Sequence, residues 1–144
     1  MNILAAIDFS DATYKLISVI SEFTKAHGAK VWLLHVADPE SPGGFDVYST
    51  ALRDGIAEEY HKEHKLLQSH AQALRDKRID TTALLVQGPA AETILQEARR
   101  LKVGAIIMGS HGHGALYDLI LGSTSTQVLK KSLCPVVIVP SRET

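Results

Sequence analysis

The sequence predicts an α/β fold in which a doubly wound, five-stranded parallel sheet is covered by helices on both faces. Five short, continuous apolar runs are spread along the chain, as expected of strands that are buried on both faces. Four stretches with the 3.6-residue spacing of amphipathic helices separate these runs. The chain has 144 residues, a length that suits one domain over residues 1–144 rather than two.

Local patterns predict the first three elements. Residues 2–7 are almost wholly aliphatic and predict the first strand, and residues 31–36 predict the second. A helix is expected between them, with Ser10 as a favourable N-cap and Gly28 as the stop signal. Its apolar residues recur at helical spacing: Ala12, Leu16, Val19, Ile20 and Phe23.

The remaining elements continue the alternation of strand and helix. Strands are predicted over 83–86, 105–108 and 136–139. Helices are predicted over 50–78, from Gly88 and Pro89 to before Gly104, and from Ser123 to about Ser132. The apolar stripe of the 50–78 helix consists of Leu52, Ile56, Tyr60, Leu67, Ala71 and Leu74. That of the helix after Pro89 consists of Ile94, Leu95, Ala98 and Leu101.

The alternation also predicts where a ligand binds. Strands separated by helices form right-handed crossovers, which place helices on both faces of a parallel sheet. Spacing along the sequence leaves the strand order open. In such sheets, ligands bind beyond the carboxyl ends of the strands, at the point where the winding reverses. The loops that follow the strands are therefore the candidate binding segments.

Composition excludes several classes of protein. Lys and Arg together number 15 and Asp and Glu 16, which gives a net charge of −1, so no basic excess favours binding to nucleic acid. The single cysteine, Cys134, excludes an internal disulfide framework and a cysteine-based zinc site. Every apolar run is shorter than the roughly 18 residues of a membrane span, and no basic segment precedes the first one. A cytoplasmic protein without a membrane partner is expected.

The most informative segment follows the predicted fourth strand. Gly109, Gly112 and Gly114 lie within six residues, and glycine allows a ligand to approach the backbone closely. Gly122 and Ser123 then begin a helix, whose N-terminal amides and positive dipole end suit a phosphate group. A tight turn followed by an ordinary helix start is the alternative interpretation. The segment is not a Walker A loop, because no Gly-Lys-Ser/Thr ends it.

The pattern Gly109-x2-Gly112-x9-Gly122-Ser123 resembles the signature of the universal stress protein family, in its ATP-binding branch. The resemblance covers essentially the whole chain. It includes Ala-Ile-Asp-Phe-Ser at residues 6–10, Leu-His-Val at 34–36 and Cys-Pro-Val-Val-Ile-Val-Pro at 134–140.

The resemblance implies a fold and a ligand. It implies the strand order 3-2-1-4-5, with a crevice between the first and fourth strands. Asp8 and the backbone of Val36 would hold adenosine, and the glycine loop would hold ribose and phosphates. The implied ligand is ATP, or AMP or ADP, with Mg²⁺ neutralising the phosphates. The implied nucleotide-binding residues are Ala6, Asp8, Val36, Met108, Gly109, Gly112, His113, Gly114, Gly122, Ser123 and Thr124.

The resemblance also implies a regulatory role in the stress response and a homodimer. The two copies would pair through the last strand, Val136–Val139, an apolar strand that would lie at a sheet edge in the implied strand order. His113 is a departure, since many ATP-binding relatives have arginine there. Arginine is always charged and grips phosphate with a fork of donors, so histidine predicts weaker or more pH-sensitive phosphate binding.

Alternatives remain for the function and for single residues. The chain could be a slow ATP hydrolase or phosphotransferase, or a dimeric scaffold that does not use nucleotide. No catalytic residue and no metal ligand is assigned, because His111 and His113 lack a third ligand nearby. Asp8 could instead cap the first helix. His35 could flank the cleft or merely pack, while His64 and Cys134 are expected to be partly buried and buried, respectively.

Overall fold

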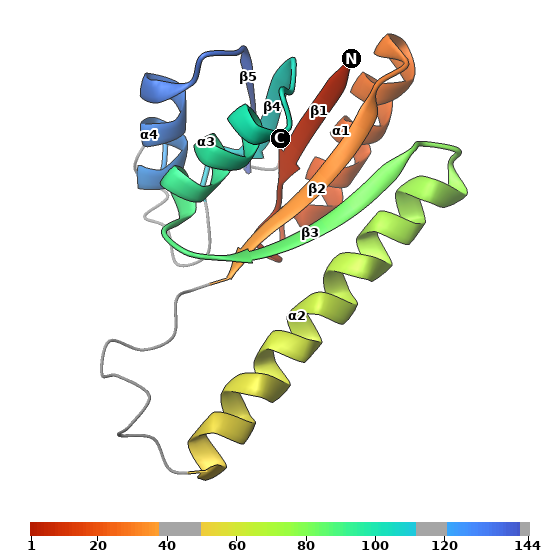
Figure 1. The fold of residues 1–144 in the computed structure, drawn as a ribbon. Helices are drawn as coiled ribbons and strands as arrows, with labels where there is room; N and C mark the ends of the chain where they lie inside the picture. The colour runs from red at the N-terminus through yellow and green to blue at the C-terminus, as the bar shows by residue number, and fades with distance from the viewer. Residues whose placement is uncertain (38–49, 112–120, 142–144) are drawn as a thin grey trace.

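Five parallel strands form one sheet with helices on both faces in a computed structural model (Figure 1). The structure describes residues 1–37, 50–111 and 121–141. The predicted alternation of strands and helices is confirmed in these residues. The elements are β1 (Asn2–Ala6), α1 (Thr13–His27), β2 (Lys30–Ala37), α2 (Thr50–Asp76), β3 (Thr81–Gln87), α3 (Ala90–Arg100), β4 (Ala105–Gly109), α4 (Ser123–Lys131) and β5 (Val136–Val139).

The strand order is β3-β2-β1-β4-β5, which confirms the order implied by the family resemblance. β1 pairs in parallel with β2 on one side and with β4 on the other. The winding therefore reverses between β1 and β4, and the loops that follow these two strands diverge at the same edge of the sheet. β3 is longer than predicted because Thr81 and Thr82 extend its pairing along β2.

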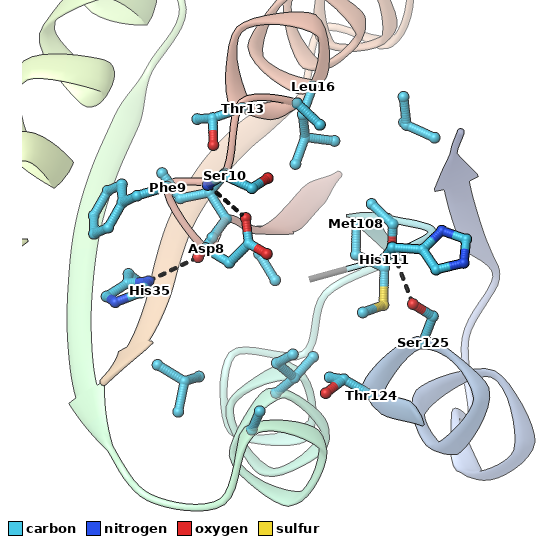
Figure 2. Close-up of a pocket in the computed structure, with 18 of the residues that line it drawn as sticks. Asp8, Phe9, Ser10, Thr13, Leu16, His35, Met108, His111, Thr124 and Ser125 are labelled. Carbon is cyan, nitrogen blue, oxygen red and sulfur yellow. Dashed lines mark hydrogen bonds between the residues drawn. The ribbon is translucent and has the colours of Figure 1, made fainter. Parts of the chain in front are cut away.

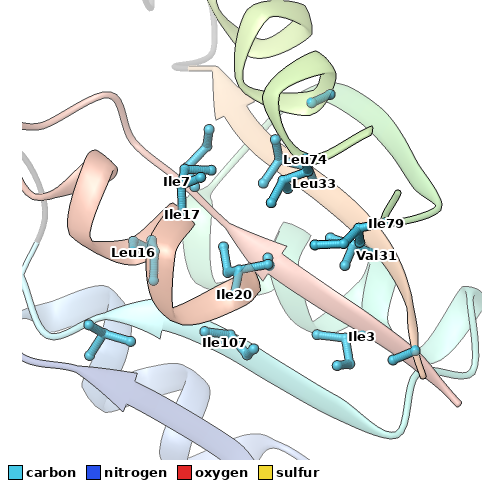
Figure 3. Close-up of a cluster of buried hydrophobic side chains, with 14 of the residues drawn as sticks. Ile3, Ile7, Leu16, Ile17, Ile20, Val31, Leu33, Leu74, Ile79 and Ile107 are labelled. Atoms are coloured by element: carbon cyan, nitrogen blue, oxygen red, sulfur yellow. The ribbon is translucent and has the colours of Figure 1, made fainter. Parts of the chain in front are cut away.

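Two apolar cores lie on opposite faces of the sheet. α1 and α2 cover one face, where Ile3 and Leu33 pack against Ile20 and Leu74 (Figure 3). α3 and α4 cover the other face, where the side chain of Leu4 lies. Burial of each large aliphatic side chain contributes roughly 1.5–3 kcal/mol, so these two layers supply most of the stabilisation. Every helix in the described residues is too short or too polar to cross a membrane.

The ends of α1 differ in how well local patterns predict them. Gly28 ends the helix as expected, with a left-handed φ of 60°. Ser10 is not the N-cap, and this prediction is wrong. The N-cap residue is Ala12, without a capping side chain. Ser10 instead belongs to a preceding turn, in which its N–H donates to Asp8 Oδ1 and its carbonyl accepts from the Thr13 N–H.

α2 is buried along only part of its length. Leu67, Ala71 and Leu74 are buried as predicted. Tyr60 is 37% exposed and His64 is exposed, so the expectation that His64 is partly buried is wrong. The N-terminal end of α2 extends past the strands of the sheet (Figure 1).

Candidate functional site

A cleft of about 620 Å³ opens at the carboxyl edge of the sheet, where β1 and β4 diverge. Its volume falls in the range of roughly 300–1,000 Å³ that is common for small-molecule sites. Its walls come from the loop after β1, the ends of β2, β4 and β5, and the facing sides of α1, α2, α3 and α4. The cleft thus lies at the position where doubly wound sheets bind ligands.

Asp8 lies on the β1 side of the cleft, two residues beyond the end of the strand. Its Oδ1 accepts the Ser10 N–H at 3.0 Å, which stabilises the turn before α1 (Figure 2). The carboxylate therefore stabilises the turn that precedes α1 and does not cap the helix itself. One carboxylate oxygen is engaged in the turn, and the other is directed away from that bond.

Ser110 anchors the opposite side of the cleft. This buried residue follows β4, and its N–H donates to the Val139 carbonyl at 2.9 Å. Its carbonyl accepts the Gly122 N–H at 2.7 Å and the Ser125 hydroxyl at 2.9 Å. Its Oγ accepts the Ser141 N–H at 3.1 Å. One buried serine thus holds the start of α4 against the ends of both β4 and β5.

The first turn of α4 supplies the amides that face this region. Gly122 is the N-cap, but its N–H is already bonded to Ser110. An α-helix has no internal carbonyl for the N–H groups of its first residues, which here are Ser123, Thr124 and Ser125. Together with the positive end of the helix dipole, these groups suit an anion. The available amides therefore begin one residue later than the sequence predicts.

The structure brings together six of the residues singled out in the sequence. They line the cleft: Ala6, Asp8, Val36, Met108, Gly109 and Thr124. At the start of α4, Gly122 is buried and Ser123 is exposed. Neither residue is part of the cleft wall formed by the described residues. Gly112, His113 and Gly114 lie outside the described residues.

One wall of the cleft is missing from the sequence prediction. Glu59, Lys62, Glu63 and Leu66 of α2 line the cleft. The helical period shows that these residues share a face with part of the apolar stripe, but not that the face reaches the cleft. Three carboxylates and the ammonium group of Lys62 therefore lie on the side of Asp8 and α2, whereas the first turn of α4 lies on the other side.

His35, at the end of β2, both packs and flanks the cleft. It is buried and lines the cleft, with Nδ1 at 2.8 Å from the Ile7 carbonyl and Nε2 at 3.4 Å from Glu63 Oε2. Cys134 is half-buried rather than buried. Among the residues that the structure describes, no cluster of three histidine, cysteine or acidic side chains is arranged to hold a metal ion.

Comparison with known proteins identifies the family. The sequence model of the universal stress protein family matches residues 1–140. The chain belongs to the universal stress protein family. It is 33% identical over 144 residues to a universal stress protein of Thermus aquaticus, with 95% of this chain and 96% of the relative covered. The solved structure of universal stress protein MJ0577 of Methanocaldococcus jannaschii superposes with a TM-score of 0.83 and 29% identity, covering 99% of this chain and 97% of the other.

More distant family structures contain nucleotides. The universal stress protein of Archaeoglobus fulgidus in complex with dAMP is 19% identical, with a TM-score of 0.69 and coverage of 96% of both chains. A universal stress protein in complex with cAMP is 18% identical, with a TM-score of 0.71, and covers 99% of this chain and 98% of the other. At this identity the likeness shows the fold alone.

Proposed function

We propose that this universal stress protein binds an adenine nucleotide, with ATP as the first choice and AMP or ADP as alternatives, and acts as a regulatory module in the stress response. Residues 1–144 would form one nucleotide-binding domain. The supporting observation is the chemistry of the cleft, which has carboxylates on one side and helix amides on the other. A nucleotide has the matching polarity, since hydroxyl and amine donors lie at one end and phosphates at the other.

The roles of individual residues follow from this orientation. Asp8 would accept a hydrogen bond from the adenosine moiety, and the backbone of Val36 would contact the base between Ala6 and Met108. Gly109 and the amides of Ser123 and Thr124 would face ribose and phosphates. Gly112, His113, Gly114 and Gly122 belong to the same phosphate-binding segment in the family pattern.

Mg²⁺ would arrive with the nucleotide. It prefers phosphate and water oxygens and rarely needs a full set of protein ligands. The described residues fit this mode, because no three histidine, cysteine or acidic side chains among them are grouped to hold a metal ion. The ion would therefore be held mainly by the phosphates and would neutralise their charge.

The direct test is calorimetric titration with ATP, ADP, AMP and cAMP, together with mass spectrometry of any ligand that copurifies. Asp8→Ala should weaken binding on the order of ten- to hundredfold, because a charge-assisted hydrogen bond is lost. Asp11→Ala is the matched control, since Asp11 is exposed three residues further along. Absence of binding to the wild-type protein would support the alternative of a dimeric scaffold.

The same preparation separates binding from turnover. A hydrolase or phosphotransferase needs a group that positions the nucleophile and a carboxylate that holds the metal. Under the proposed orientation Asp8 is taken by adenosine, so little phosphate release is expected. Phosphate release above background that is abolished by Gly112→Val would instead indicate a slow hydrolase.

We also propose that two copies pair through β5. This strand lies at one edge of the sheet, so one side of its backbone is not bonded to β4. Leu133 is 87% exposed and Leu129 is 48% exposed beside it. Pairing across a two-fold axis would satisfy the edge and cover these side chains.

A further inference from the structure

Ile7, the residue before Asp8, is bonded to β2 through both its N–H and its carbonyl. The Ile7 N–H donates to the Leu34 carbonyl at 2.9 Å. The Ile7 carbonyl is 2.8 Å from Nδ1 of His35, and because a carbonyl only accepts, this nitrogen must carry a proton. The His35 side chain thus extends the pairing of β1 with β2 up to the peptide bond that begins Asp8 (Figure 2).

The residue after Asp8 has an unusual backbone conformation. Phe9 has a φ of 62°, in the left-handed region that a bulky side chain rarely adopts. Its ring lies 4.2 Å from the His35 ring, between centroids, and 6.1 Å from the His70 ring. Contacts of the phenyl ring therefore stabilise a turn that the local sequence disfavours, and strained residues of this kind cluster at binding sites.

The imidazole of His35 is itself held in place. Its ring is buried, and Glu63 Oε2 lies 3.4 Å from Nε2, on the side of the ring opposite the bond to Ile7. This contact becomes an ion pair when the ring carries a second proton. The bond to Ile7 therefore orients the ring, and the contact with Glu63 adds to it only when Nε2 also carries a proton, because Nε2 without a proton and a carboxylate are both acceptors.

We propose that His35 is the positioning residue of the nucleotide site, acting through Asp8. This inference rests on the proposed function. The hydrogen bond from Nδ1–H of His35 fixes Ile7, the residue before Asp8. The His35 ring packs against the ring of Phe9, the left-handed residue after Asp8. Asp8 Oδ1 is then bound to the Ser10 amide, and the second carboxylate oxygen would be held toward the ligand. A ligand pays less to order a carboxylate that is already oriented.

The experiment compares three histidine variants. His35→Ala removes both the donor and the ring and should weaken ATP binding about tenfold. His35→Asn places an amide N–H near the position of Nδ1 and should restore affinity to within about threefold of wild type. His27→Ala is the matched control, since His27 also has Nδ1 2.8 Å from a carbonyl and a ring 4.3 Å from a phenylalanine, at the far end of α1. It should bind like wild type.

Two further measurements distinguish positioning from a general structural role. In the Asp8→Ala background, His35→Ala should cause no further loss of affinity, because the residue acts through Asp8. Without ligand, the Ser10 amide should exchange with solvent faster in His35→Ala than in wild type or His27→Ala. Ring-nitrogen NMR spectra should show the proton of neutral His35 on Nδ1.

These experiments distinguish failure of the proposed function from failure of the proposed role of His35. If the wild-type protein binds no nucleotide, the proposed function fails, and the exchange of the Ser10 amide still tests the positioning. The inference is overturned if His35→Ala binds as tightly as wild type, if its effect adds to that of Asp8→Ala, or if Ser10 exchange is unchanged.

Discussion

His70 is a half-buried titratable residue on α2, away from the proposed ligand contacts. Its ring lies 5.6 Å from that of Tyr14, edge to face, in addition to its contact with Phe9. Burial lowers the pKa of His70 below its usual value, because desolvation disfavours the charged ring. The unfolded chain therefore binds a proton more readily than the folded protein does.

The lowered pKa predicts a pH dependence of stability. The contribution of His70 is fully present above the unfolded pKa of about 6.5 and is lost as the pH falls from that value through the lower pKa of the folded protein. Urea unfolding between pH 5 and 7.5 should show stability rising with pH, and His70→Phe should flatten this rise. An unchanged slope in the variant would mean that other groups cause the dependence.

Single residues also show where sequence patterns fail. Ser10 has a favourable N-cap side chain, but the turn formed by Asp8 and the left-handed Phe9 delays the start of α1 to Thr13. The preference of serine for the N-cap position is a property of an isolated helix end, so it cannot predict that another turn forms there instead. His35 is a different case. Its place at a strand end left packing and a position beside the cleft as alternatives, and the structure shows both.

Among the helices, the end of α1 offers a clean test of backbone conformation. Gly28 has a φ of 60°, and a Cβ added there would meet nothing within 4 Å. Gly28→Ala should therefore lower the free energy of unfolding by about 1 kcal/mol through backbone strain alone. Denaturant titration measures this change.

Gly55 provides the matched control for that substitution. It lies within α2, and an added Cβ there also meets nothing within 4 Å. Gly55→Ala should stabilise the protein by roughly 0.5–1 kcal/mol, because alanine favours a helix. Equal effects of the same sign at both positions would contradict the assignment of Gly28 as a left-handed cap.

The order and type of the helices and strands could be predicted from the sequence, whereas the residues at which they begin and end could not. Continuous apolar runs identified every strand of the described sheet, since strands buried on two faces leave that signature. The predicted helix over 50–78 ends two residues early, because Arg78 adopts a φ of 64°. Periodicity also cannot show how far a helix extends beyond its sheet, which is why the exposure of His64 was missed.

At the scale of the whole molecule, topology explains which parts of the site the sequence revealed. Asp8 follows β1 and Gly109 ends β4, and these two strands pair directly with each other where the winding reverses. Their meeting at one cleft therefore follows from the strand order. Glu59 and Glu63 reach the cleft through the placement of α2 against the sheet, and spacing along the sequence carries no information about that placement. The nucleotide, the residue roles and the cytoplasmic location stay predictions.

The proposed dimer makes a prediction for the edge strand. The Ser110 N–H donates to the Val139 carbonyl and the Ile106 N–H to the Pro135 carbonyl, so alternate residues of β5 face β4. The backbone of Val136 therefore points to the free edge. Val136→Pro removes its N–H and should shift the protein toward the monomer in sedimentation velocity. Val136→Ala, which keeps the N–H, should remain a dimer; a monomeric wild-type protein would refute the pairing.

Ser110 bonds to the first turn of α4 and to the end of β5, so the α4 side of the cleft and the outer strand share one anchor. Under the proposed function, any coupling that this anchor carries between nucleotide binding and self-association is reciprocal. Whatever factor nucleotide adds to the affinity between two copies, association adds the same factor to the affinity for nucleotide. The concentration of the protein itself would then set how sensitively it responds to the nucleotide level of the cell.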